Sequence, residues 1–376
     1  MRRVAIVFRM DQRGGVQSCV LSLARKLNEM GIVPELLWDT QPLWQMLDEQ
    51  GVRATHYPLK FVFSSRCIAK LPDCLRRLCK TFNIVRTSRL DKKYDFVYSF
   101  DNGFLVDDAT PHLYYLSGPP LLPQLEIPRK GFAGIPSKIV RQVYHHVLSS
   151  GFPAYEYHKD STYVINSQFT ADLFLEAHGI ELPVVYPPIR LRREREPFAL
   201  WKMRNAVVFF SRIVDYKHPE LVVQLAGSFP DYEYVIMGGV SDNRREYVQQ
   251  LRALAATSPH NNVRFVTNPT DAQVRGVFRT AKFYVFPARN EHFGMTTVEA
   301  IDHGAVPFVH DSGGQREIVP VDGLRFGYDE FITKFGELQR KPDAELFGIV
   351  DHLQQHIENY EEGRFQAKMV SFACLV

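Results

Sequence analysis

Short apolar runs that alternate with glycine turns and helical patterns are the feature of this chain that most limits its possible folds. Residues 4–8 form a continuously apolar run, as expected for a strand that is covered on both faces. Gly14 and Gly15 follow, then a helical pattern up to Gly31, and a second strand is predicted over residues 34–38. A strand, a turn, a helix and a further strand in this order form a βαβ unit. The sequence therefore predicts an α/β fold built on parallel sheets.

The same alternation starts again in the second half of the chain. Further strands are predicted in both halves, over residues 96–99, 112–116 and 162–165, and then 207–210, 234–237, 263–266, 283–286 and 305–309. Between the two series lies a charged, proline-flanked stretch, 190–197, which is typical of a domain boundary. A chain of 376 residues is also too long for one ordinary core. We predict a first domain over residues 1–188 and a second over 189–376, whose last helix could return to the first domain.

The net charge of +3 gives no general signal for nucleic-acid binding. The segment from Lys60 to Lys93 is different, because it carries ten lysines and arginines against only Asp73 and Asp91. Such a segment could face an anionic membrane surface or an anionic acceptor, and a solvated helical face is the alternative.

The five cysteines are odd in number and form no C-x-x-C pair, so neither a disulfide framework nor a zinc site is expected. A reducing cytoplasm is the natural compartment for such a chain. No run approaches the roughly 20 apolar residues of a membrane span. Any membrane contact is therefore expected to be peripheral, at the inner face of the membrane.

The stretch from Glu291 to Glu299 carries the clearest chemical signal. Glu291 follows a predicted strand, and Glu299 lies eight residues later, where an apolar helical pattern begins. Between them Gly294, Thr296 and Thr297 have the composition of a helix N-terminus that receives an anion. The pattern indicates a phosphate between two carboxylates that bind hydroxyl groups on either side. A glycosidase pair, with carboxyl groups about 5–9.5 Å apart around one bond, does not require such a turn.

Two cations follow the predicted strand 207–210. Arg212 offers a planar fork to phosphate oxygens, and Lys217 offers a compact point charge. Together they could neutralise a leaving diphosphate, although two ordinary surface cations would give the same pattern. The Gly14-Gly15 pair after the first strand is a weaker signal, because most such pairs are only tight turns.

Taken together, these motifs resemble those of the retaining glycosyltransferases with two Rossmann-like domains, the GT-B fold, and within them the large family 4. The E-x7-E motif from Glu291 to Glu299 is the most specific element of the resemblance. Other similar segments are 211–217, 235–239 and 310–319 in the second half, and 14–17, 166–171 and 186–189 in the first. The resemblance implies that a nucleotide-diphosphate sugar binds in the cleft between the domains, mostly against the second.

The resemblance also implies roles for four charged residues. Arg212 and Lys217 would hold the diphosphate and stabilise the charge that develops on it. Glu291 would contact hydroxyl groups of the donor sugar, which makes it a catalytic residue beside Arg212 and Lys217. Glu299 would contact the ribose hydroxyls.

Further donor contacts are implied at positions that match the family by sequence. Gly15 would let the backbone of the first domain approach the phosphate, because no side chain intervenes. Asn268 lies where the base is usually read. The amides at the start of the helix would bind sugar and phosphate, over Phe293, Gly294, Met295, Thr296 and Thr297.

The chain departs from the family at one position. Many members have a His after the strand that corresponds to residues 113–116, whereas this chain has Ser117. A Ser cannot replace His in proton transfer near neutral pH, so Ser117 is predicted at most to orient sugar or phosphate, unless the local alignment has slipped. His112 lies on the strand itself, where a buried structural His is the alternative to a ligand contact. His292 is expected to support Glu291 rather than to contact the ligand.

The resemblance implies a retaining, metal-independent, hexosyl-type glycosyltransferase. It needs no cofactor, because the nucleotide sugar is a substrate, and the expected acceptor is a hydroxyl of a glycan or glycolipid in cell-envelope polysaccharide or lipopolysaccharide synthesis. Two alternatives stay open at this point. A nucleotide-sugar epimerase of the same fold would need no acceptor, and a non-catalytic nucleotide-sugar-binding protein would bind the donor without transfer.

Overall fold

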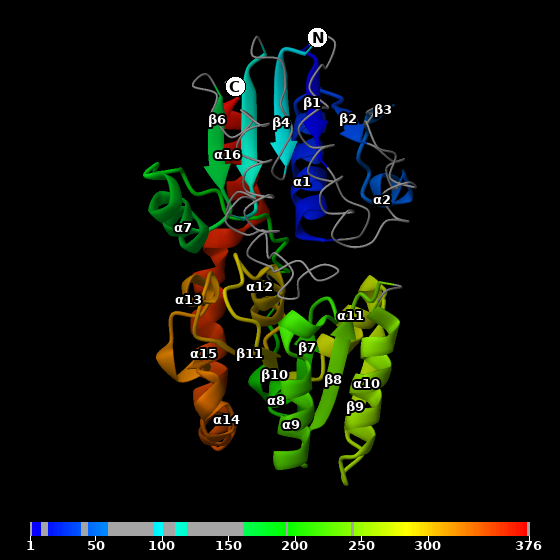
Figure 1. Cartoon of the computed structure of the whole chain (residues 1–376), viewed down its shortest axis with the longest axis vertical. Coiled ribbons are helices and arrows are strands. Elements are labelled where there is room, and N and C mark those ends of the chain that lie inside the picture. Colours follow the sequence, from blue (N-terminus) through cyan, green and yellow to red (C-terminus); the bar gives the residue numbers. More distant parts are fainter. Residues whose placement is uncertain are drawn as a thin grey trace, which may run out of the picture. The chain divides into compact units, whose positions relative to one another are not determined.

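The computed structural model describes residues 2–8, 14–38, 44–58, 94–100, 110–118, 161–192, 195–241 and 244–373. The chain divides into two compact units (Figure 1). Unit 1 comprises Met1–Asn166, Thr170–Pro188 and Phe365–Val376, and unit 2 comprises Ser167–Phe169 and Ile189–Arg364. The main crossing into unit 2 therefore lies between Pro188 and Ile189, and the chain returns to unit 1 at Phe365.

Unit 1 is built on a parallel six-stranded sheet with the order β3-β2-β1-β4-β5-β6. Its strands are β1 (Val4–Val7), β2 (Glu35–Trp38), β3 (Thr55–Pro58), β4 (Phe96–Phe100), β5 (His112–Leu116) and β6 (Thr162–Ile165). Every residue of β1, β4 and β5 is buried, which explains why these strands are almost continuously apolar in the sequence.

The helices of unit 1 include one that comes from the far end of the described chain. They are α1 (Gly15–Glu29), α2 (Trp44–Glu49), α7 (Gln168–His178) and α16 (Glu362–Phe372), of which α7 and α16 begin in residues assigned to unit 2. From α16 (red in Figure 1), Phe365, Met369 and Val370 join the same buried core as α1 and the strands. The Tyr98 hydroxyl donates to the carbonyl of Met369 at 3.2 Å. The core of unit 1 is therefore completed by residues that follow unit 2 in the chain.

Unit 2 repeats the architecture with a parallel sheet in the order β12-β11-β10-β7-β8-β9. Its strands are β7 (Ala206–Phe210), β8 (Glu233–Gly238), β9 (Val263–Thr267), β10 (Ala281–Phe286), β11 (Val306–His310) and β12 (Arg325–Phe326). Its α-helices are α8 (Phe198–Trp201), α9 (Glu220–Ser228), α10 (Arg245–Ala256), α11 (Asp271–Phe278), α12 (Met295–Asp302), α13 (Gln315–Ile318), α14 (Phe331–Leu338) and α15 (Asp343–His356). Short 3₁₀ turns include η2 (Asp215–Lys217), η4 (Asp322–Leu324), η5 (Tyr328–Glu330) and η6 (Ile357–Tyr360).

The predicted α/β fold with two Rossmann-like halves is confirmed, and each strand predicted from an apolar run is present. Two strands were missed, β3 and β12, and both lie at the end of a sheet. An edge strand does not need an apolar run, because part of it faces solvent. In β3, Thr55 and Tyr57 are exposed.

Several sequence predictions lie outside the described residues. They concern the basic segment from Lys60 to Lys93 and four of the five cysteines. The remaining one, Cys19, is a buried free thiol on α1. Within the described part of the chain, no helix combines the length and the apolar character that crossing a membrane requires.

Candidate functional site

The sheet of unit 2 has a topological switch point between β7 and β10. The chain leaves β7 towards β8 and β9 on one side, whereas β10, β11 and β12 lie on the other. In open α/β sheets, ligands bind beyond the carboxyl ends of the strands at such a point. Arg212 and Lys217 follow β7, and Glu291 follows β10, so three residues chosen from sequence lie at this edge.

Lys217 and Glu291 form an ion pair there. Lys217 ends the 3₁₀ turn η2 and is only 9% exposed, and its Nζ atom lies 5.1 Å from the ring centre of Phe286, the last residue of β10. Both partners are thus held partly out of water, where a charge interaction is stronger than at an open surface. The predicted phosphate-binding cation and sugar-binding carboxylate are in direct contact.

Arg212 differs from Lys217 because its side chain is exposed. Its Nη2 group donates to the Tyr216 hydroxyl at 2.9 Å, which directs the guanidinium without neutralising its charge. The turn before it depends on Gly238, since a Cβ atom at that position would lie 1.5 Å from the carbonyl oxygen of Ser211. The glycine in the 235–239 motif therefore lets the ends of β7 and β8 approach each other beside Arg212.

The loop that carries Glu291 rests on the turn after β11. The Gly314 amide donates to the Glu291 carbonyl at 2.8 Å. Gly313 has a φ of +70°, and a Cβ atom there would lie 2.5 Å from the same carbonyl oxygen. At Gly314, a Cβ atom would lie 2.5 Å from the carbonyl oxygen of His292. The two glycines of the 310–319 motif thus bring this turn against the backbone of the Glu291 loop.

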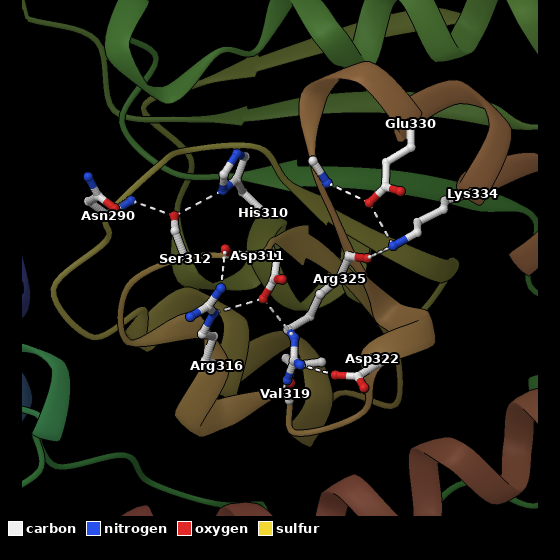
Figure 2. A network of polar contacts seen from close by, with 11 residues as sticks. Asn290, His310, Asp311, Ser312, Arg316, Val319, Asp322, Arg325, Glu330 and Lys334 are labelled. Atoms are coloured by element: carbon white, nitrogen blue, oxygen red, sulfur yellow. Dashed lines mark hydrogen bonds and ion pairs between the residues drawn. The ribbon is translucent and has the colours of Figure 1, made fainter.

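A polar network fixes this turn in unit 2 (Figure 2). Ser312 Oγ accepts the Asn290 N–H at 2.8 Å and lies 2.9 Å from His310 Nδ1. Burial is the main cause that lowers the pKa of His310 to about 4, and the nearby positive charge of Arg289 is the second. The imidazole is therefore neutral at neutral pH. The Ser312 hydroxyl can therefore accept from Asn290 and donate its own proton to a neutral His310 Nδ1, because a hydroxyl group is both acceptor and donor.

Beside these residues, charged side chains secure the remainder of the same turn. Asp311 pairs with Arg316 at 2.8 Å and with Arg325 at 3.0 Å, and the Arg316 side chain is the first cause that lowers the pKa of Asp311. Glu330 accepts the Gly327 N–H at 3.0 Å and pairs with Lys334 at 2.6 Å. These contacts (Figure 2) hold the connections after β11 and β12 together.

The N-terminus of α12 begins at Gly294, whose φ of 113° and ψ of 52° lie in the left-handed region. The amides of Thr297 and Val298 both donate to the Gly294 carbonyl, at 2.9 Å and 3.4 Å. The amides of Met295 and Thr296 are the first-turn N–H groups left without an acceptor inside the helix. Of the predicted amide stretch, these two are therefore the strongest candidates for an anion.

The side chains of this stretch point to structural partners. Phe293 is 2% exposed and packs edge-on against Tyr360, with ring centres 5.1 Å apart. Thr296 Oγ1 lies 2.8 Å from the hydroxyl of Tyr284, which also donates to the carbonyl of Phe210 at 3.3 Å. Tyr284 thereby ties α12 to the ends of β7 and β10. Its role was not predicted from the sequence, because a tyrosine in an apolar strand looks like an ordinary core residue.

Glu299 lies further along α12 and is half-buried. Its carboxyl group is desolvated, and burial, together with the charges of Asp302 and Asp271, raises its pKa to about 7. Near neutral pH the group therefore exists in both protonation states. A carboxyl group so placed can accept hydrogen bonds from hydroxyl groups when ionised.

Asn268 is exposed at the carboxyl end of β9 and has a left-handed φ of 50°. Its backbone N–H donates to the Gly238 carbonyl at 2.8 Å, and its side-chain Oδ1 atom accepts the Val240 N–H at 2.8 Å. Both contacts join the ends of β8 and β9, so Asn268 shapes the edge of the sheet where the base was predicted to lie.

Three residues considered from sequence belong to unit 1. Gly15 is the exposed first residue of α1, after β1. Ser117 follows β5, and its carbonyl accepts a hydrogen bond from Asn166 at 2.9 Å. His112 is buried, lies 2.7 Å from Ser99 Oγ and stacks on Tyr114, so it is a structural histidine of the sheet. Within the described residues, no cluster of His, Cys, Asp or Glu could hold a metal ion.

The part of the chain that contains the site at the carboxyl ends of β7 and β10 is similar to a known protein family. Residues 192–324 match the family model described as "Glycosyl transferases group 1", a range that runs from before β7 to the end of η4. The matched range lies within unit 2. It includes all of the unit 2 candidates, from Arg212 to Glu299, and the 310–319 motif.

Two relatives are similar over parts of their length. A GDP-Man:Man(3)GlcNAc(2)-PP-Dol alpha-1,2-mannosyltransferase of Yarrowia lipolytica is 38% identical over 88 residues, which are 23% of this chain and 14% of the relative. A GDP-mannose:cellobiosyl-diphosphopolyprenol alpha-mannosyltransferase of Komagataeibacter xylinus is 29% identical over 143 residues, 37% of this chain and 36% of the relative. The matched stretches thus cover about a seventh of the first relative and little more than a third of the second.

Among solved structures, the Anabaena protein HepE in complex with UDP and glucose has a TM-score of 0.70 and 15% identity, with both chains covered completely. At this identity the likeness establishes the fold. The predicted GT-B fold, with one parallel six-stranded sheet in each unit, is confirmed.

Proposed function

We propose that the protein is a retaining, metal-independent glycosyltransferase that moves a hexosyl group from a nucleotide-diphosphate sugar to a hydroxyl of a glycan or glycolipid. The observation that carries this proposal is the arrangement at the switch point of unit 2. There Lys217 pairs with Glu291, Arg212 is exposed beside them, and the free amides of α12 follow the Glu291 loop. Cations and helix amides are the groups that bind phosphate, and a carboxylate beside them suits a sugar.

The residues would act together on the bond between the sugar and the diphosphate. The amides of Met295 and Thr296 and the side chains of Arg212 and Lys217 would receive the diphosphate. Glu291 would exchange its contact with Lys217 for donor-sugar hydroxyls, and Glu299 would hold the ribose.

In the reaction, the bond from the sugar C1 atom to the diphosphate oxygen breaks, and a bond to the acceptor oxygen forms on the same face. The leaving diphosphate takes the acceptor proton, so the configuration at C1 is retained and no protein base is required. The main contribution of the protein is then to stabilise charge on the leaving group. Arg212 and Lys217 supply that charge, so transfer should continue when a chelator is present.

A thermal-shift screen against UDP-, GDP-, ADP- and TDP-sugars tests the donor class directly. A ligand at 100 times its Kd stabilises the folded state by about 2.7 kcal/mol, which gives a clear shift in Tm. GDP-mannose is the first donor to test, because the names of the similar relatives specify it, and UDP-glucose is the second, after the ligands of the Anabaena structure. No stabilisation by any nucleotide sugar would contradict the proposal.

A transfer assay then distinguishes the proposed activity from its alternatives. The first acceptors to test are diphosphopolyprenol-linked glycans, as in the names of the relatives, and lipopolysaccharide precursors from the cell envelope. Conversion of the nucleotide sugar without any acceptor would indicate an epimerase instead. Donor binding without hydrolysis or transfer would indicate a binding protein.

A further inference from the structure

The side-chain amide of Gln315 lies under the turn that begins α12. Gln315 is the first residue of α13 and is fully buried. Its Oε1 atom accepts the Thr297 hydroxyl at 2.9 Å. Its Nε2 atom, also buried, has no hydrogen-bond partner among the described residues.

This unpaired amide is directed at Gly294. A Cβ atom built on Gly294 would lie 2.6 Å from Gln315 Nε2. Gly294 is therefore constrained twice, by its left-handed φ of 113° and by the amide that fills the space of a side chain. Gln315 contacts both the residue that caps the helix and, through Thr297, the end of its first turn. Between these contacts lie the free amides of Met295 and Thr296.

Buried polar groups in folded proteins are almost always paired, because an unpaired donor loses its hydrogen bonds to water without replacement. An apolar side chain of similar size would fill the same space without that cost. A sequence that keeps the costly group at a ligand-binding turn is consistent with a role in the bound state.

We propose that Gln315 is a positioning residue for the donor diphosphate. Its amide holds Gly294 and the first turn of α12 in the conformation that presents the Met295 and Thr296 amides. Its Nε2–H group gains a hydrogen-bond acceptor in this turn only when a nucleoside diphosphate, alone or as part of the nucleotide sugar, is bound. This inference rests on the proposed function, and it adds a residue that acts on the donor through the first turn of α12.

Two variants of the full chain test the inference. The double variant Gln315→Leu with Thr297→Val removes the hydrogen bond and the unpaired amide together, and replacing both partners by apolar groups is nearly neutral for stability. We expect its Tm without ligand to equal or exceed that of the wild type. The Kd for GDP or UDP, measured by calorimetry, should rise about tenfold, as expected when a hydrogen bond that supports a charged ligand is lost.

The second variant, Gln315→Glu, keeps an oxygen acceptor for Thr297 but removes the N–H donor. It should also weaken nucleotide binding by at least about tenfold, because a carboxylate then lies beneath the anion site. The matched control is Gln354→Leu. That glutamine amide is paired, since it donates to the Ile301 and Asp302 carbonyls at 3.2 and 3.3 Å, near the other end of α12. The control should lower the Tm and leave the nucleotide Kd unchanged.

A purely structural role for Gln315 would give the opposite pattern, with a lower Tm and an unchanged Kd in the double variant, and would overturn the inference. An unchanged Kd in Gln315→Glu would overturn it as well. A wild-type protein that binds none of the nucleotides overturns the proposed function and this inference with it. If the wild type binds a nucleotide and both Gln315 variants bind it with the same Kd, the inference alone is overturned and the proposed function stands.

Discussion

The ammonium group of Lys217 pairs with the carboxylate of Glu291 across the carboxyl ends of β7 and β10, two adjacent strands that are remote in the sequence. Each group neutralises the other while no ligand is bound. A nucleotide sugar would offer phosphate oxygens to Lys217 and hydroxyl groups to Glu291, so binding exchanges one ion pair for two new sets of contacts. The pair would therefore keep two oppositely charged groups in place for the diphosphate and the sugar of a donor.

Replacing Arg212 and replacing Lys217 should have similar effects on transfer but different effects on the free energy of unfolding. Arg212→Ala and Lys217→Ala should each reduce the kcat/KM of transfer by the equivalent of about 2–4 kcal/mol, because each removes a charge from the leaving group. Arg212 is exposed, so its loss should change the free energy of unfolding by no more than about 0.5 kcal/mol. Lys217→Ala should lower it clearly, since Glu291 is left without its partner. Thermal unfolding and initial rates measure both effects, with the exposed Lys202→Ala as control. Near-normal rates in both variants would exclude these residues from the site.

The two carboxylates should act on different parts of the donor. Glu299→Ala should weaken binding of both the nucleotide sugar and the bare nucleoside diphosphate. Glu291→Ala should depress transfer but keep, or even strengthen, binding of the bare nucleotide, because Lys217 then has no competing carboxylate. Titration calorimetry of both variants with the nucleotide sugar and with the bare nucleoside diphosphate measures these differences in affinity. Loss of the bare nucleotide in Glu291→Ala, with retention in Glu299→Ala, would reverse the assigned orientation of the donor.

The raised pKa of Glu299 predicts how stability depends on pH. Below its ordinary value of 4.5, the carboxyl group is protonated in the folded and the unfolded chain and contributes no difference. Between that value and about 7, only the unfolded chain ionises, so the free energy of unfolding falls as the pH rises, and the loss is complete above about 7. Glu299→Gln should therefore gain on the order of 1–3 kcal/mol relative to the wild type between pH 5 and pH 8. Urea unfolding at the two pH values measures this gain. Parallel pH profiles of the two proteins would contradict it.

The glycine turn after β11 should be essential for the Glu291 loop. Gly313→Ala introduces a Cβ atom 2.5 Å from the Glu291 carbonyl oxygen at a φ of +70°. We expect a loss of about 1–3 kcal/mol in stability together with impaired transfer, because the backbone of Glu291 must move. Gly323→Ala is the matched control, since nothing lies within 4 Å of its Cβ position. Equal stability and activity in the two variants would show that the turn does not position Glu291.

The basic segment from Lys60 to Lys93 predicts binding to anionic membranes. Each lysine or arginine near such a surface contributes about 1 kcal/mol, and exposed charges are screened over about 8–10 Å at physiological salt. Sedimentation with anionic vesicles should therefore fall as salt rises and fall further when Arg86, Arg89, Lys92 and Lys93 are replaced by serine. Neutral vesicles serve as the control. Equal sedimentation with both vesicle types would leave only the solvated-face interpretation of this segment.

The fold was largely predictable from sequence because parallel strands buried on both faces leave continuous apolar runs, such as residues 4–7 and 206–210. The edge strands β3 and β12 leave no such signal. The approach of Arg212, Lys217 and Glu291 to one edge was also predictable, since residues that follow parallel strands share that edge. Their pairing was not, because Lys217 meets Glu291 only through the adjacency of β7 and β10, which sequence spacing does not encode.

Supporting residues were harder to predict than charged ones. Tyr284 looks like a core residue until its hydroxyl is found between Phe210 and Thr296. Gln315 lies inside a segment that already resembled the family, but nothing in the local sequence shows that its amide is buried beneath Gly294. Their roles depend on contacts between distant segments, and such contacts become visible only in three dimensions.

The position of α16 in unit 1 has a consequence for how the protein is made. During synthesis the ribosome releases the strands of unit 1 first, yet Phe365, Met369 and Val370 of their core emerge only after the whole of unit 2. Unit 2 has all its strands by then and can fold as a nearly continuous segment, while unit 1 waits with a gap beside α1 and β4. Unit 2 is thus expected to finish folding before unit 1, and a ribosome stalled before Phe365 would hold a folded unit 2 attached to an incomplete unit 1.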